Sequence, residues 1–112
     1  MTVEHGGTLA AMTSIPQPPA SLEVAAVLHA LADPVRLDIV RQLSESDTAI
    51  ACRRFDTPVA KNTLSHHFKI LREAGVIATH PEGGQRLNAL RTAELEASFP
   101  GLLRAILPKA QS

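Results

Sequence analysis

The chain has 112 residues, the length of a single small domain, and its formal net charge is zero. Phenylalanine is its only aromatic residue type, which argues against the row of flat rings on which single-stranded nucleic acids stack. One cysteine excludes an internal disulfide and a thiolate cluster, and it fits a reducing cytosol. No apolar run reaches membrane-spanning length and no secretory signal is visible, so we expect a cytoplasmic protein without a membrane partner.

The charges are distributed unevenly along this neutral chain. Residues 53–91 carry seven Lys or Arg and three Asp or Glu, a net charge of +4, and the rest of the chain carries the compensating −4. A basic segment in a chain that is otherwise acidic indicates a nucleic-acid face, but an ordinary solvated surface can show the same pattern. Charge alone therefore leaves both interpretations open.

The first third of the chain predicts an arm followed by two helices. Residues 1–19 contain Gly-Gly and Pro-Gln-Pro-Pro and few large apolar groups, as expected of a flexible arm. Residues 20–32 predict a helix with a broad apolar stripe formed by Leu22, Val24, Ala25, Val27, Leu28 and Leu31. Asp33 is suited to cap a second helix, and Pro34 fills its first position without losing a hydrogen bond. We expect that second helix to bury Val35, Leu37, Val40 and Leu43.

The remaining segments predict helices and one hairpin. DTAIACRRF predicts a short helix capped by Asp47 or Thr48, and NTLSHHFKILREAG predicts a fourth helix that ends at Gly75. VIATH and QRLNALR predict two strands joined by PEGG, with Gly83-Gly84 in the turn. The segment after them is helical with an interruption at Pro100, where a helix starting at Ser98 is plausible, and residues 108–112 form a tail. This order predicts a mainly α domain with a small β-hairpin over residues 20–107, a winged helix-turn-helix.

The predicted fourth helix has two unlike faces. At 100° per residue, Leu64, Phe68 and Leu71 fall on one side and face the core. The opposite side holds Asn62, Ser65, His66, Lys69, Arg72 and Glu73. Cationic side chains suit phosphates or guanine edges, and Asn and Ser suit adenine edges or phosphates. A solvated helix face is the plainer interpretation, but the hairpin that follows favours DNA binding.

The adjacent histidines in this helix do not form a metal pair. Consecutive helical residues point about 100° apart, so His66 and His67 cannot hold one ion from a single helix. Metal pairs on a helix are three or four residues apart, and the possible partners at that spacing are Thr63 and Ile70. We expect His66 on the outer face and His67 packed at the edge of the apolar face. The sequence offers no nucleophile elbow and no carboxylate pair beside a pocket, so we expect no enzyme.

Three segments together carry a family resemblance. ALADPVRLDIVRQL, TLSHHFKILREAGVI and the Gly-Gly hairpin with its arginine resemble the ArsR/SmtB family of bacterial winged-helix transcription regulators over roughly residues 20–107. The resemblance implies a homodimer, assembled through the first and last helices, that binds an inverted-repeat DNA operator. It also implies that the fourth helix enters the major groove. By position, the implied DNA-binding residues are Lys61, Asn62, Thr63, Ser65 and His66, with Lys69 and Arg72 on phosphates and Arg86 on the wing.

The resemblance also implies effector sensing, but the family's two familiar metal sites are absent. One uses a cysteine pair on the third helix, where this chain has only Cys52 between Ala51 and Arg53. The other uses Asp and His on the last helix, and residues 92–112 contain neither. We therefore expect no certain cofactor, with nickel or zinc at a non-standard site as one possibility, because imidazole suits both ions. Its candidate ligands are His5, His29 and His80.

Several alternatives remain open from the sequence. Cys52 beside Arg53 and Arg54 has the setting of a redox-sensitive thiol, although a small buried helix residue is the interpretation we favour. His5 fits a terminal residue outside the fold, His29 a dimer interface, and His80 a strand near the wing. The regulator is then metal-responsive, thiol-responsive or independent of an effector. The alternative from another class is a winged helix used only for protein–protein assembly.

Overall fold

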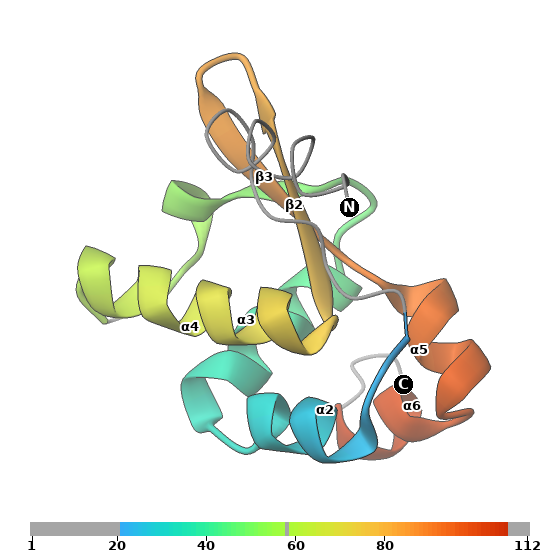
Figure 1. Ribbon diagram of the computed structural model, residues 1–112. Helices are drawn as coiled ribbons and strands as arrows, with labels where there is room; N and C mark the ends of the chain where they lie inside the picture. Colours follow the sequence, from blue (N-terminus) through green and yellow to red (C-terminus); the bar gives the residue numbers. More distant parts are fainter. Residues whose placement is uncertain (1–20, 58, 108–112) are drawn as a thin grey trace, which may run out of the picture.

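The computed structural model describes residues 21–57 and 59–107 (Figure 1), so the predicted arm and tail and His5 lie outside the described residues. The described helices and strands follow in chain order: α2 (Val24–Leu31), α3 (Pro34–Ser44), β1 (Ile50–Ala51), the 3-10 turn η1 (Cys52–Arg54), α4 (Lys61–Ala74), β2 (Ile77–Glu82), β3 (Gln85–Leu90), α5 (Thr92–Ser98) and α6 (Leu102–Ile106). The sheet projects from one side of the helices as a wing, and α2 and α6 lie at the opposite end of the molecule (Figure 1). The winged helix-turn-helix fold predicted from the sequence is confirmed.

The junction between α2 and α3 forms as predicted. Asp33 is extended, and its carboxylate accepts hydrogen bonds from the amides of Val35 and Arg36 at 2.9 and 3.0 Å. Pro34 occupies the first helical position, where a missing amide hydrogen costs nothing. The Arg36 amide is the main reason that the pKa of the Asp33 carboxyl lies below its ordinary value, and the nearby Arg36 guanidinium acts in the same direction.

Asp33→Ala tests this cap. We expect the variant to lose about 1 kcal/mol of unfolding free energy at neutral pH, the usual cost of deleting an N-cap side chain. Because the folded-state pKa of Asp33 is lowered, its contribution is complete above the unfolded pKa and disappears as the pH falls through the folded value. Urea denaturation of both proteins between pH 7 and acid should therefore show two curves that converge below about pH 4. A difference that is independent of pH would contradict the capping role.

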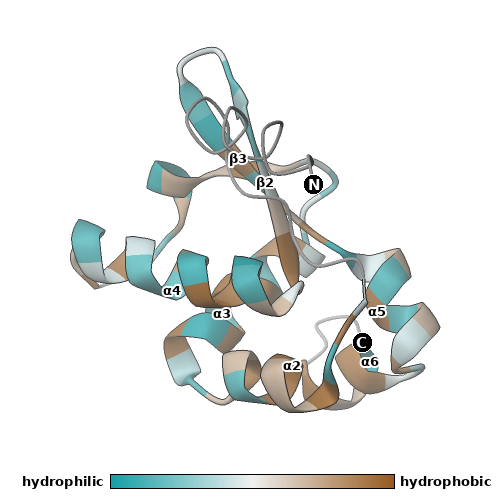
Figure 2. Ribbon diagram, viewed as in Figure 1, coloured by the Kyte–Doolittle hydropathy of each residue, from teal (hydrophilic) through white to brown (hydrophobic). Residues whose placement is uncertain are grey.

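One aliphatic core joins the helices to the base of the sheet. Its fully buried members come from every layer, and include Val27, Ile39, Leu71, Ile77 and Leu95. Hydrophobic residues lie along α2, α6 and the base of the sheet, while the wing tip and much of α4 are hydrophilic (Figure 2). The fold therefore leaves one end of the molecule polar, and this end includes α4 and the wing.

The burial predicted for α3 is wrong at two positions, and the apolar stripe predicted for α2 is only partly covered by the core. On α2, Val27 and Leu31 are buried, whereas Val24 and Leu28 remain 54% and 50% exposed. The apolar stripe of this helix is wider than the surface that the core covers, so one edge of it stays open. On α3, Val35 and Leu37 are only partly buried. The buried residues on α3 are Ile39, Val40, Leu43 and, unexpectedly, Arg36.

The sheet has three antiparallel strands in the order β1-β3-β2. The predicted hairpin is confirmed, with Ile77 opposite Leu90 at its base and Glu82 opposite Gln85 at its tip. Gly83 and Gly84 both adopt positive φ, 59° and 83°, which a tight turn between right-twisted strands requires.

The predicted short helix over DTAIACRRF is wrong. Ile50 and Ala51 instead pair with Asn88 and Leu87 as a third strand, and only one 3-10 turn, Cys52–Arg54, follows. The hydroxyl of Ser46 accepts from the Thr48 amide and donates to the Thr48 carbonyl, so this loop is closed by Ser46 and not by a helix cap. The chain leaves the turn extended at Phe55, which enters the core.

The C-terminal helical segment is interrupted where Pro100 predicted it. The second part, α6, begins at Leu102 and not at Ser98. Gly101 precedes it with φ of 84°, a conformation that residues with a side chain rarely adopt, so the break between the helices spans Pro100 and Gly101.

Candidate nucleic-acid interface

Helix α4 divides its side chains as the sequence predicted. Leu64, Phe68 and Leu71 are buried, and so is His67. The predicted contact residues Lys61, Asn62, Thr63, Ser65, His66 and Lys69 are all exposed, and Arg72 is partly exposed. The exposed row runs along almost the full length of the helix. One side of α4 therefore presents cations, hydroxyls, an amide and an imidazole without a large apolar group.

Both ends of α4 suit a helix that contacts nucleic acid. No side chain caps its first turn after Ala60, so the first amides point outward unpaired by a cap, and such a helix start favours an anion. At the other end, Gly75 has φ of 86° and its amide donates to the Arg72 carbonyl at 3.0 Å. The amide of Val76 donates to the Leu71 carbonyl, which turns the chain sharply into β2. The wing therefore follows the helix directly.

The wing places Arg86 near the start of α4. Arg86 is exposed on β3, opposite Pro81 and just after the Gly83-Gly84 turn. Lys61 and Ser65 of α4 line one cavity together with Arg86. The start of the helix and the wing therefore share one side of the molecule.

One polar cluster holds α4 against α3, and a second holds the loop that precedes α4. Arg36 is 7% exposed, and its Nη1 donates to Nδ1 of His67 at 3.1 Å. Because a guanidinium has no acceptor, Nδ1 of His67 is the acceptor and the ring proton lies on Nε2. Arg36 Nε also donates to the Ala30 carbonyl at 2.7 Å, and Nη2 to the His29 carbonyl at 3.3 Å. One side chain thus joins the end of α2, the start of α3 and the middle of α4.

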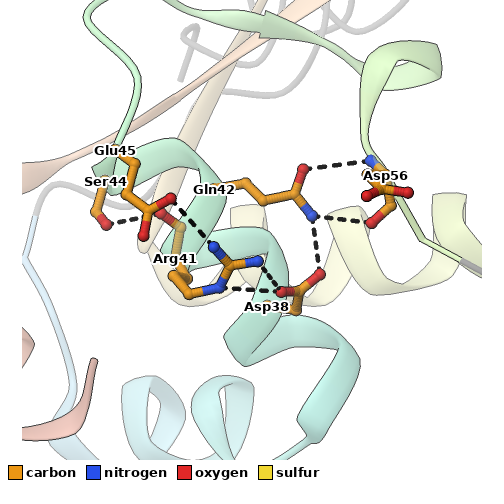
Figure 3. A network of polar contacts seen from close by, with 6 residues as sticks. All are labelled: Asp38, Arg41, Gln42, Ser44, Glu45 and Asp56. Atoms are coloured by element: carbon orange, nitrogen blue, oxygen red, sulfur yellow. Dashed lines mark hydrogen bonds and ion pairs between the residues drawn. The ribbon is translucent and has the colours of Figure 1, made fainter. Parts of the chain in front are cut away.

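The second cluster holds the loop before α4 (Figure 3). Gln42 donates from Nε2 to the Asp56 carbonyl at 3.0 Å, and its Oε1 accepts from the Asp56 amide at 3.2 Å. Asp38 fixes Gln42 by accepting from Nε2 at 2.8 Å, and Arg41 bonds Asp38 and Glu45 in turn. These contacts attach the chain between η1 and α4 to the surface of α3, which restricts where α4 can start.

His67 lies where its sequence position predicted, whereas the buried Arg36 was not predicted. His67 packs at the edge of the apolar face, as predicted, and it also accepts a hydrogen bond from a neighbouring helix. Arg36 was not singled out, although it is four residues before Val40 and seven before Leu43, on the face of α3 that packs inward. A charged residue at this spacing from two apolar core positions was the signal that could have indicated a buried Arg36. Asn88, which is fully buried, gave no such signal in the sequence.

The effector candidates do not gather in the described part of the chain. Cys52 is half-buried in η1, with its Sγ 3.2 Å from Nδ2 of Asn88. His29 is exposed on α2, and His80 is exposed on β2, where its Nε2 lies 3.6 Å from Glu82 Oε1. Among residues 21–57 and 59–107, no three His, Cys, Asp or Glu side chains are placed to hold a metal ion. A nickel or zinc effector stays a prediction, and one described chain does not assemble its ligands.

Comparison with known proteins places this geometry in a class. A protein-family model described as a helix-turn-helix domain matches residues 31–80. The chain is 34% identical to the HTH-type transcriptional regulator YceK of Bacillus subtilis over 84 residues, 73% of this chain and 84% of that protein. It is 31% identical to the transcriptional repressor SdpR of the same organism, over 71% of this chain and 89% of the repressor.

A solved structure gives the same assignment. The crystal structure of the transcriptional repressor BigR from Xylella fastidiosa superposes with a TM-score of 0.56 at 26% identity, covering 88% of this chain and 97% of BigR. The protein is therefore a winged helix-turn-helix transcriptional regulator, and helix-turn-helix regulators are a class of DNA-binding proteins. It belongs to the ArsR/SmtB family. No helix in the described part is long and apolar enough to cross a membrane.

Proposed function

We propose that the protein binds an inverted-repeat DNA operator as a homodimer, with α4 in the major groove and the wing on the adjacent backbone. The observation that carries this proposal is the exposed polar row of α4 beside Arg86 of the wing. Asn62 and Ser65 are the candidates for base edges, because amides and hydroxyls pair with adenine edges or phosphates. Lys69, Arg72 and Arg86 are the candidates for phosphates, and Lys61, Thr63 and His66 complete the contact surface.

The charges on this surface are available to a polyanion. Within the described residues, Lys61, Arg72 and Arg86 make no ion pair with a carboxylate. Lys69 pairs with Glu73 at 3.3 Å, but both side chains are more than 60% exposed. An exposed pair of this kind contributes little, so a phosphate can replace the carboxylate at small cost.

The open edge of α2 supports the homodimer. Val24 and Leu28 are separated by one helical turn and form an exposed apolar strip at the end of the molecule away from the wing. Pairing two such strips about a two-fold axis buries both, and it leaves both wings free on the other side. Two α4 helices related by that axis would contact two half-sites in opposite orientation, which is the symmetry of an inverted repeat.

The double substitution Val24→Lys/Leu28→Lys tests the dimer. We expect the variant to be folded but monomeric, because four lysines would stand across the proposed interface in place of the apolar side chains that it buries. Light scattering after size-exclusion chromatography measures the mass. Thr48→Lys, in an exposed loop after α3, is the control and should remain dimeric. A double variant that keeps the mass of the wild type would exclude this face from the interface.

Selection from random-sequence duplexes tests the operator. The proposal predicts enrichment of an inverted repeat whose half-site centres are about 10 base pairs apart or a multiple of that distance. The monomeric variant should recover single half-sites at most. Enrichment of an asymmetric sequence by the dimer would contradict the inverted-repeat operator. No enrichment at all would contradict DNA binding and favour the protein–protein assembly alternative.

A further inference from the structure

A cavity of about 280 Å³ lies where η1, the start of α4 and the wing meet. Its lining comes from four elements: Ala51, Cys52, Arg53, Lys61, Leu64, Ser65, Phe68, Gly84, Gln85 and Arg86. Its volume matches that of roughly nine water molecules in the liquid, so a ligand of about ten non-hydrogen atoms fits. The cavity is separate from the clusters around Arg36 and Gln42 that hold α4 in place.

Three cations surround this cavity, and no carboxylate lines it. Arg53 comes from η1, Lys61 from the first turn of α4 and Arg86 from β3. Within the described residues none of the three has an ion-pair partner, whereas Arg41 pairs with Asp38 and Glu45. Three cationic residues from separate elements therefore line one cavity, and an anionic group bound there would have three cations available to it.

The floor of the cavity is apolar. Leu64 and Phe68 are 8% and 3% exposed, and they form the inner wall with Ala51. Ser65 and Gln85 add a hydroxyl and an amide at the sides. Cys52 is held by Nδ2 of Asn88, so its position on the wall is fixed by the sheet. A cationic rim over an apolar floor fits a ligand with one anionic group and a small apolar body.

We propose that this cavity binds a small organic carboxylate, and that the bound carboxylate competes with DNA. A phosphodiester of the double helix or inorganic phosphate satisfies the cations but brings no apolar body to Leu64 and Phe68. The competition rests on the proposed function, because Lys61, Ser65 and Arg86 belong to both surfaces. Binding of the carboxylate to the cavity does not require that the protein also binds DNA. By reciprocity, DNA lowers the affinity for the carboxylate by the same factor as the carboxylate lowers the affinity for DNA.

Benzoate is the probe for direct binding, because its nine heavy atoms and single charge match the cavity in size and chemistry. Backbone amide shifts are followed by nuclear magnetic resonance during titration. Benzamide has the same ring without the charge, and acetate has the charge without the ring. We expect saturable benzoate shifts confined to residues around Arg53, Lys61, Ser65 and Arg86, and much weaker binding of both controls.

Arg53→Gln provides the matched variant, because Arg53 lines the cavity but is not a proposed DNA contact. We expect it to weaken benzoate about fivefold, the upper range for one exposed ion pair. Arg54→Gln makes the same charge change one residue later, outside the cavity lining, and should alter the affinity much less. Non-saturable shifts, equal binding of benzamide, or equal loss in the two variants would each overturn the site.

A second titration separates the site from its consequence. At constant ionic strength, benzoate should raise the dissociation constant of the selected duplex for the wild type and less so for Arg53→Gln. Benzoate binding without any effect on DNA affinity would overturn the competition. If no duplex binds at all, the proposed function fails, but the resonance titration still decides whether the cavity takes a carboxylate.

Discussion

Arg36→Met is expected to lower the free energy of unfolding by about 3 kcal/mol, because it removes one buried charge-assisted network while keeping a side chain of similar length. Three acceptors lose their donor in this variant: the carbonyls of His29 and Ala30 and Nδ1 of His67. All three lie in or beside the packed junction of α2, α3 and α4. The cost comes mainly from the Ala30 carbonyl and Nδ1 of His67, whose bonds to Arg36 are buried, because the His29 carbonyl still accepts from the Ala32 amide at 3.1 Å.

Urea denaturation measures this effect, and two further variants identify its cause. Arg36→Lys keeps the charge but not the fork of donors, so it should recover only part of the loss. Arg104→Met changes an exposed arginine on α6 and should have little effect. If Arg36→Met lost less than about 1 kcal/mol, the contacts around His67 would not be the element that fixes α4 against α3.

Lys69→Ala/Arg86→Ala is expected to weaken DNA binding about a hundredfold at moderate salt. In a homodimer the two substitutions remove four phosphate contacts, one pair from α4 and one from the wing. Each phosphate contact releases condensed counterions, so the plot of log affinity against log salt should also become shallower by about 4. Fluorescence anisotropy of a labelled duplex at several salt concentrations gives both quantities.

Arg104→Ala, once light scattering shows that it has the same mass as the wild type, is the control for this pair, because it removes a cation from α6, at the other end of the molecule from the wing (Figure 1). It should leave the slope nearly unchanged. Equal losses from the control and from the double variant would indicate that net charge, and not the surface of α4 and the wing, governs binding.

The parts of the fold that could be predicted from the sequence are those with local signals. Asp33-Pro34 defines a helix start by an acceptor and a fixed φ, and both act within one turn. Gly75 and the Gly83-Gly84 pair mark left-handed positions, which set the end of α4 and the hairpin turn. The exposed row of α4 could be predicted from the 3.6-residue helical period, because the apolar residues of this helix all fall on the face that packs against the core.

The parts that could not be predicted depend on distant partners. Ile50 and Ala51 form a strand only because β3, more than thirty residues later, presents Leu87 and Asn88 to them. Asn88 is buried because Thr79 donates to it and Ile50 accepts from it, at 2.8 and 3.1 Å. No local sequence pattern predicts such a network of hydrogen bonds.

The candidate site was predicted in part for the same reason. Its row on α4 lies within a single helix, whereas the cavity needs η1, α4 and the wing to come together. In the sequence, Arg53 was therefore considered only as a neighbour of Cys52. The structure shows that it lines the same cavity as Lys61 and Arg86.

The most direct test of the central claim is fluorescence anisotropy of the wild-type protein with the duplex upstream of its own gene and with the duplexes recovered by selection, as salt is raised. The account predicts tight binding at low salt that weakens steeply and linearly on logarithmic axes, with a selected inverted repeat bound better than a scrambled duplex of equal length. Binding to no duplex at low salt, or binding that does not change with salt, would contradict it and leave α4 and the wing as a surface for protein assembly.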